Sequence, residues 1–226
     1  MISAIIVAAG SSARMGNSDK LFLTFGAKPV ILHTLLCYQA AQSIDEIIVV
    51  AKKARHREIH DLSQQNGVRK VTAIVEGGAD RNASVRNAIC AVNPKCQYVA
   101  IADGARPLTD PKDIDKVSAA ARKHGAAILG VPAKDTVKQL SPDGKIATSP
   151  PRETLLQAQT PQTFHKETYI QLSDRAMAQR LSVTDDSSIF EAFGHQVTAV
   201  IGSYKNIKIT TPEDIQIAKA LWEETV

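Results

Sequence analysis

Apolar and polar positions follow two different periods up to about residue 133 of the chain. Short apolar runs rich in β-branched residues predict buried strands, whereas apolar residues at three- and four-residue spacing predict helices. The predicted strands span residues 3–9, 46–51, 70–76, 98–103 and 126–133. The predicted helices span residues 30–42, 54–67, 80–92 and 110–125. Such alternation predicts an α/β fold with a mainly parallel sheet and helices on both of its faces.

This pattern changes after residue 133, where a polar, turn-rich segment extends to residue 164. The sequence SPDG within it favours a β-turn between two short extended pieces. We therefore expect one domain over residues 1–226, with a projecting β-hairpin arm inserted at about 133–160. A lone hairpin buries little of its own surface, so a partner subunit is its natural cover. The remaining predictions are a helix over 184–194, strands over 196–203 and 206–210, and a helix over 211–224.

Composition narrows the possible functions. A net charge of +4 suits an anionic small molecule, and with aromatic residues at 4% the chain does not resemble a nucleic-acid binder. The spacing of Cys37, Cys90 and Cys96 matches no zinc site and is typical of reduced thiols in the cytosol. No apolar run reaches the ~20 residues of a membrane span, and the N-terminus lacks the basic region of a signal peptide. We expect a cytoplasmic protein.

Three predicted loops should meet at one edge of the sheet, because ligands of parallel sheets bind beyond the carboxyl ends of the strands. These loops span residues 9–20, 76–84 and 103–107. The first contains AAGSSARMGNSDK, which matches neither common nucleotide-binding fingerprint. Its small residues let backbone N–H groups approach a polyanion, and Arg14 and Lys20 add positive charge. An ordinary turn with two solvated cations is the alternative.

Four other features are candidates for chemistry, each with a simpler explanation. Asp103 ends an apolar strand and could bind Mg²⁺ beside a polyphosphate, or could only form a turn before Gly104. The sequence EGGADRNASV could face a flat ring or only cap a helix. Lys208, within the predicted strand 206–210, is either solvent-facing or a cation at the mouth of the site. Residues of the arm would be solvated by default.

A set of motifs appears in order from residue 8 to the C-terminus: AAGSSARMG with DK, PVILHTL, GGADRNASV, DGARP, PAKDTVK, QTPQTF, TDDSS and NIKITTPEDI. The set resembles the 2-C-methyl-D-erythritol 4-phosphate cytidylyltransferases of the non-mevalonate isoprenoid pathway. The first motif is shared by many nucleotidyltransferases, and the combination of DTVK, QTPQ, TDD and NIKIT is more specific. The chain departs from the family pattern at ADR, residues 79–81, where an acidic pair is commoner.

The resemblance implies a Rossmann-like nucleotidyltransferase fold, a homodimer with interlocking arms, and transfer of a cytidylyl group from CTP to methylerythritol phosphate. It implies that Arg14 and Lys20 hold the CTP phosphates and that Lys208 lies beside the α-phosphate. Asp103 would bind Mg²⁺ or another divalent cation. The nucleotide would lie against Ala8, Ala9, Gly10, Gly78, Ser84 and Arg106. The sugar phosphate would contact Thr184 and, from the neighbouring subunit, Thr136 and Arg152.

Other functions stay open. A ribitol-5-phosphate cytidylyltransferase shares QTPQ and NIKITTP, although DTVK and TDDSS favour the methylerythritol enzyme. Another sugar-phosphate nucleotidyltransferase is a more distant alternative. A non-enzymatic nucleotide-binding regulator could be built on the same fold, since a fold does not fix a function. The presence of Arg14, Lys20, Asp103 and Lys208 argues against the regulator.

Overall fold

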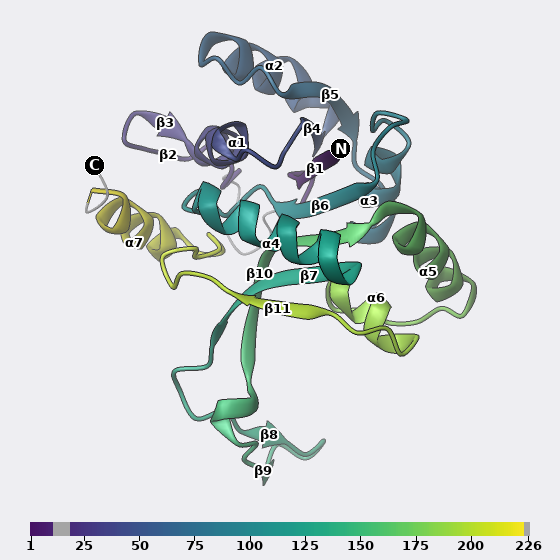
Figure 1. The fold of residues 1–226 in the computed structure, drawn as a ribbon. Helices are drawn as coiled ribbons and strands as arrows, with labels where there is room; N and C mark the ends of the chain where they lie inside the picture. The colour runs from purple at the N-terminus through teal and green to yellow at the C-terminus, as the bar shows by residue number, and fades with distance from the viewer. Residues whose placement is uncertain (11–18, 224–226) are drawn as a thin grey trace.

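The computed structural model describes residues 1–10 and 19–223 of the chain. Within them, a seven-stranded sheet has the order β11-β7-β10-β6-β1-β4-β5 (Figure 1). All neighbouring strands in it are parallel except for β10, which is antiparallel to both β6 and β7. The strands are β1 (Ile2–Val7), β4 (Glu46–Ala51), β5 (Val71–Glu76), β6 (Tyr98–Asp103), β7 (Ala126–Pro132), β10 (Leu156–His165) and β11 (Thr198–Ile201). The predicted α/β fold with a mainly parallel sheet is confirmed.

Helices cover both faces of this sheet, because alternate residues of its strands point to opposite sides. In β1, Ile2, Ala4 and Ile6 pack with α1, α2, α4 and α7, whereas Ile5 packs with α3, α5 and α6. The helices are α1 (Val30–Ala40), α2 (His56–Gln65), α3 (Arg81–Ile89), α4 (Pro111–His124), α5 (Lys166–Ala178), α6 (Asp186–Ala192) and α7 (Pro212–Glu223). Short 3₁₀ segments are η2 (Lys53–Arg55) and η3 (Arg152–Thr154). Among the described residues, no helix has the length and apolar character needed to cross a membrane.

The predicted arm is present but ends earlier than expected. It leaves the sheet after β7, at the same edge as the other carboxyl ends, and projects from the domain (Figure 1). Its tip is an antiparallel hairpin of β8 (Gln139–Leu140) and β9 (Ile146–Thr148), joined by the predicted turn. A second small hairpin, β2 (Thr24–Phe25) with β3 (Lys28–Pro29), precedes α1.

Strand β10 shortens the predicted arm, which was expected to span about residues 133–160. It is a central strand between β6 and β7, so the arm ends at residue 155. Side chains of Gln159, Thr160 and Gln162 are buried and hydrogen-bonded, and the polarity of these residues is why the hydrophobic pattern predicted no strand there. The buried polar residues of β10 are Gln159, Thr160, Gln162 and Thr163.

Two further differences lie towards the C-terminus. Helix α5 was not predicted, and the predicted strand over residues 206–210 is wrong, because this segment is irregular. Its backbone and side chains are held by other parts of the chain instead of by a sheet ladder. The Asn206 side chain donates to the Thr160 carbonyl at 3.1 Å, and the Ile209 N–H donates to the Ala105 carbonyl at 2.9 Å.

The helix predicted over 211–224 is confirmed as α7. Its first turn is closed by Asp214, whose Oδ2 accepts from the Thr211 N–H at 2.8 Å and from the Thr210 N–H at 2.7 Å. These bonds satisfy backbone donors that a helix start would otherwise leave unpaired.

The apolar packing of β10 provides a test of its place in the core. Phe164 is fully buried and stacks on Phe190 of α6, with ring centroids 4.6 Å apart. We expect Phe164→Ala to lower the free energy of unfolding by about 3–5 kcal/mol, because it removes a large buried ring and leaves a cavity. Urea unfolding measures the change. Ile201→Ala, at a side chain 58% exposed on β11, is the control and should cost much less. Equal losses in the two variants would contradict a central position for β10.

Candidate functional site

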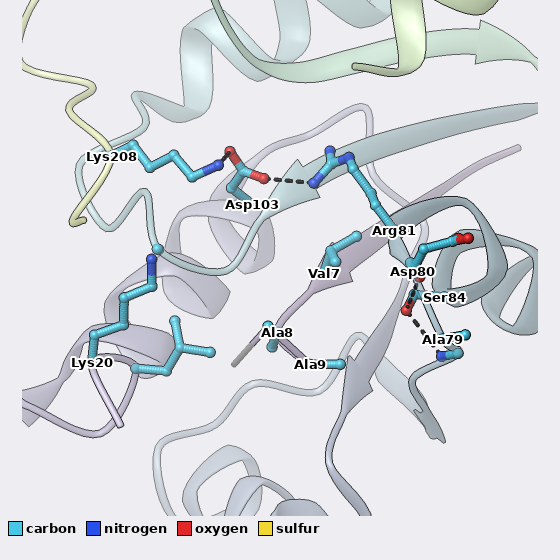
Figure 2. A pocket seen from close by; sticks show the side chains of 14 residues that line it. Val7, Ala8, Ala9, Lys20, Ala79, Asp80, Arg81, Ser84, Asp103 and Lys208 are labelled. Carbon is cyan, nitrogen blue, oxygen red and sulfur yellow. Dashed lines mark hydrogen bonds and ion pairs between the residues drawn. The ribbon is translucent and has the colours of Figure 1, made fainter. Parts of the chain in front are cut away.

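A cavity of about 390 Å³ opens beyond the carboxyl ends of β1 and β6 (Figure 2). The predicted meeting of three loops at one sheet edge is therefore confirmed for the residues described. The C-terminal segment adds Lys208 to them. The lining residues are Val7, Ala8, Ala9, Gly10, Lys20, Leu21, Gly78, Ala79, Asp80, Arg81, Ser84, Asp103, Ala105 and Lys208.

Two glycines let the loop after β5 approach the end of β1. A Cβ at Gly77 would overlap the side chain of Ala9, and one at Gly78 would overlap Ala83. The loop is fixed by Ser84, whose Oγ accepts from the Gly78 N–H at 3.0 Å and donates to the Asp80 carbonyl at 2.8 Å. Small residues therefore bring backbone from two strands within reach of one ligand.

Helix α3 begins at this wall of the cavity. Asp80 is its N-cap, and the Asp80 side chain accepts from the Ala83 N–H at 2.8 Å. The ADR sequence that departs from the family pattern therefore combines a helix cap with the first residue of the helix, Arg81. The Arg81 side chain extends across the cavity towards Asp103 (Figure 2).

Asp103 ends β6 and is the electrostatic centre of the site. Its Oδ1 lies 2.8 Å from Arg81 Nη1, and its Oδ2 lies 2.9 Å from Lys208 Nζ and 3.5 Å from Arg106 Nε. Burial by itself would raise the pKa of Asp103, but the charges of these three cations outweigh it and lower the pKa from 3.8 to about 2. The carboxylate is thus ionised throughout the physiological pH range.

An ionised carboxylate that lines a cavity is a kind of ligand that hard divalent cations prefer. Mg²⁺ is usually held by one or two carboxylates, with phosphate oxygens and water as its other ligands. The described residues contain no group of three His, Cys, Asp or Glu side chains that could hold a metal by themselves. Asp103 therefore fits the chemistry of a cation that arrives with a phosphate ligand.

The structure brings eight of the predicted site residues to this one cavity. They are Ala8, Ala9, Gly10, Lys20, Gly78, Ser84, Asp103 and Lys208. Arg14 lies outside the described residues. Arg81 also lines the cavity but was not predicted as a site residue, and its only signal in the sequence was its position in ADR, where the chain departs from the family pattern. Lys208 reaches the cavity from an irregular segment, not from the predicted strand.

Arg106 does not border the cavity. Its side chain is nearly buried, and its Nη1 donates to the Asn206 carbonyl at 2.6 Å. Burial is the main cause that lowers the pKa of this guanidinium, and Asp103 opposes the shift. Arg106 joins the end of β6 to the segment that carries Lys208.

The three predicted sugar-phosphate residues lie elsewhere. Thr184 borders a second cavity of about 400 Å³ between α3, α5 and α6, which shares Asp80 and Arg81 with the first. Thr136 and Arg152 are exposed on the arm, where Arg152 Nη1 donates to the Lys134 carbonyl at 3.1 Å. Within one chain neither of these two residues lines the first cavity.

A mainly parallel sheet with small residues, lysines and an ion-paired aspartate at its carboxyl edge is the arrangement expected of an α/β nucleotidyltransferase fold, and solved structures of such proteins share this fold. Residues 2–224 match the family model of IspD, 2-C-methyl-D-erythritol 4-phosphate cytidylyltransferase. The chain therefore belongs to this family.

Individual relatives agree with the family match. Proteins with that name from Dehalococcoides mccartyi (strain ATCC BAA-2266 / KCTC 15142 / 195) and Syntrophotalea carbinolica are 41% and 43% identical to the chain. The alignments cover 97% and 96% of this chain, and 95% and 94% of the relatives. A crystal structure of 4-diphosphocytidyl-2C-methyl-D-erythritol synthase from Anaerococcus prevotii is 35% identical, with a TM-score of 0.88 over 98% of this chain and 96% of that one.

The lowered pKa of Asp103 predicts a dependence of stability on pH. Because the folded pKa lies below the unfolded one, ionised Asp103 stabilises the fold above about pH 4, and this contribution is lost as the pH falls towards 2. We expect the stability advantage of the wild-type protein over Asp103→Asn to shrink by about 2 kcal/mol between about pH 5 and pH 2. Urea unfolding of both proteins at each pH measures this. A difference that stays constant across the range would contradict the assigned ion pairs.

Proposed function

We propose that this protein transfers the cytidylyl group of CTP to 2-C-methyl-D-erythritol 4-phosphate and releases pyrophosphate. The observation that carries the proposal is the cavity at the carboxyl edge of the sheet, where Lys20, Lys208 and Asp103 meet, in a chain that belongs to the IspD family over residues 2–224. This reaction supplies precursors of isoprenoids in the non-mevalonate pathway.

The chemistry suits a site without a general base. The attacking group is a phosphate monoester, whose second pKa is about 6, so it is mostly dianionic at neutral pH. Its oxygen attacks the α-phosphorus of CTP, and the bond from that phosphorus to the bridging oxygen breaks. The electron pair of that bond leaves with pyrophosphate. No histidine borders the cavity among the described residues, in agreement with this scheme.

The main obstacle is repulsion between two anions, so the protein must supply alignment and positive charge. We assign Lys20 and Lys208 to the phosphates of CTP, and Arg14, outside the described residues, to the same task. Asp103 would hold Mg²⁺, which neutralises phosphate charge when bound. The cytidine would lie against backbone at Ala8, Ala9, Gly10, Gly78 and Ser84.

Lys208 contacts Asp103 as well as lining the cavity. Its ammonium is paired with Asp103 at 2.9 Å, although its side chain remains 41% exposed. A triphosphate that enters the cavity offers this ammonium stronger negative charge than one carboxylate does. We infer that the Lys208 ammonium binds a phosphate of the nucleotide.

A homodimer completes the proposed sugar-phosphate site. The arm exposes three apolar side chains, Val137, Leu140 and Ile146, at 43%, 61% and 63% of their surface. Burial against a second copy would remove this apolar surface from water. It would also carry Thr136 and Arg152 away from their own domain to another one. A cytoplasmic location, expected from the cysteines, belongs to the same proposal.

One assay separates the candidate functions. The purified protein is incubated with Mg²⁺, each of four nucleoside triphosphates, and either methylerythritol phosphate or ribitol 5-phosphate, and release of pyrophosphate is followed. Release with CTP and methylerythritol phosphate alone is the expected result. Release with ribitol 5-phosphate would identify the alternative cytidylyltransferase, and release with no pair would favour a regulator.

Substitution of either cavity lysine tests the electrostatic role. We expect Lys20→Ala and Lys208→Ala each to lower kcat by ~10²–10³, because each removes a charge that stabilises the transition state. Lys219→Ala, at an exposed position of α7, is the control and should retain wild-type activity. Steady-state kinetics measure kcat, and circular dichroism checks the fold. A kcat close to that of the wild type in a folded cavity variant would refute the assignment.

The arm is tested by Arg152→Ala. We expect the KM for methylerythritol phosphate to rise about tenfold or more, since a charge-assisted hydrogen bond contributes about 1.5–3 kcal/mol. The KM for CTP should change little. Lys145→Ala, on the same arm and paired with Asp143 at 2.9 Å, is the matched control. An unchanged KM for methylerythritol phosphate in Arg152→Ala would exclude this role for the arm.

A further inference from the structure

The Arg81 guanidinium connects two carboxylates that belong to different parts of the fold. Its Nη1 lies 2.8 Å from Asp103 Oδ1, at the end of β6. Its Nη2 and Nε lie 2.8 and 3.1 Å from Asp186 Oδ2, at the start of α6. The first contact is drawn in Figure 2. Arg81 thus forms part of the wall between the two cavities and lines both of them.

Burial and opposite charge both stabilise the contacts of Arg81 with Asp103 and Asp186. Side chains of both acids are largely buried, with 10% exposure at Asp103 and 3% at Asp186. Burial would lower the pKa of Arg81, but the two carboxylates outweigh it and raise that pKa further above its usual range. A planar guanidinium offers several N–H donors in fixed directions, which a lysine ammonium cannot reproduce.

Hydrogen bonds hold Asp186 and the start of α6 against α5 and β10, so the contact with Asp186 connects Arg81 to these elements as well. The Tyr169 hydroxyl donates to Asp186 Oδ1 at 2.8 Å. The start of α6 is tied to β10 through Gln162, whose Nε2 donates to Asp185 Oδ2 at 2.7 Å and whose Oε1 accepts from the Ser187 N–H at 2.9 Å. Thr184, proposed above for the sugar phosphate, lies two residues before Asp186.

We propose that Arg81 is a positioning residue that couples the two substrate sites. By holding Asp103 and Asp186 at once, it fixes the nucleotide side of the cavity relative to the segment that carries Thr184. Nucleotide bound at Asp103 then stabilises the arrangement that the sugar phosphate requires. This inference rests on the proposed function, because it assigns the second substrate to the Thr184 side.

If the ion pairs of Arg81 had only a structural role, a different experimental result would be expected. It would stabilise the fold, and its loss would weaken both substrates without changing how one affects the other. Coupling is measured directly as the ratio of two dissociation constants, for methylerythritol phosphate without and with a bound nucleotide. The nucleotide probe is α,β-methylene CTP with Mg²⁺, which cannot release pyrophosphate. Calorimetry gives both constants without turnover.

The variants are Arg81→Met, Arg81→Lys, Asp186→Asn and the double variant Arg81→Met with Asp186→Asn. Arg86→Met is the matched control, because Arg86 lies on the same helix, pairs with Asp174, and borders neither cavity. Urea unfolding reports the stability of each protein. Arg81→Lys retains the positive charge, and the double variant removes the unpaired buried charge at Asp186, so at least one variant should fold.

We expect the nucleotide to tighten binding of methylerythritol phosphate about fivefold or more in the wild type and in Arg86→Met. The ratio should fall close to one in Arg81→Met, and Arg81→Lys should not restore it even if its stability matches that of the wild type. Asp186→Asn should lower the ratio, and the double variant should lower it no further than Arg81→Met does.

Wild-type coupling in folded Arg81→Met or in the double variant would overturn the inference and leave the proposed function intact. A ratio of one in the wild type itself would also overturn it. Failure of the wild type to bind methylerythritol phosphate at all would instead refute the proposed function, and the inference with it.

Discussion

A buried carboxylate must be paired, and the pairing of Asp103 determines how the rest of the site is built. Removing a charge from water is costly unless opposite charges and hydrogen bonds replace the solvent. The cations that contact Asp103 come from α3, from the turn after β6, and from the segment before α7. One carboxylate at the end of one strand therefore holds α3 and the segment before α7, which are far apart in sequence, against the turn that follows β6.

The contacts around this carboxylate form a connected network with β10. The Asp103 N–H donates to Thr160 Oγ1 at 3.1 Å, and the Asn206 side chain donates to the Thr160 carbonyl. Arg106 closes the network through the Asn206 carbonyl. Thr160 of β10 thus occupies a core position where it organises the site, and its partners offset the cost of burying it.

The sequence was sufficient to predict the helices and strands that are determined by a local residue pattern. Continuous apolar runs predicted β4 and β6 with their observed bounds, and glycine and proline positions indicated the ends of α4. Strand β10 was not predicted because most of its buried residues are polar, and a hydrophobic pattern does not detect a strand whose core positions are mainly polar. The irregular path of residues 206–210 depends on Asn206 and its partners on β10, so no local signal could reveal it.

The site likewise has features that follow from local sequence and features that depend on contacts between distant residues. The loops predicted to meet do meet, because parallel strands bring their carboxyl ends to one edge. Sequence does not show which way a side chain turns after a strand ends, and Arg106 turns inward towards Asn206. The importance of Arg81 depends on Asp186, 105 residues further along the chain, so it becomes evident only in three dimensions.

The ends of the arm form a hydrogen-bonded pair. Leu156 lies opposite Pro132 in the β7–β10 ladder, and the Ala133 N–H donates to the Leu155 carbonyl at 3.1 Å. A segment that leaves and returns at one point can be lengthened, shortened or exchanged at small entropic cost to the domain. Evolution can therefore alter the surface that the arm presents to other molecules without altering the register of the strands that support the cavity. The arm is in this sense a separate module, whose length and surface can change while the sheet beneath it stays the same.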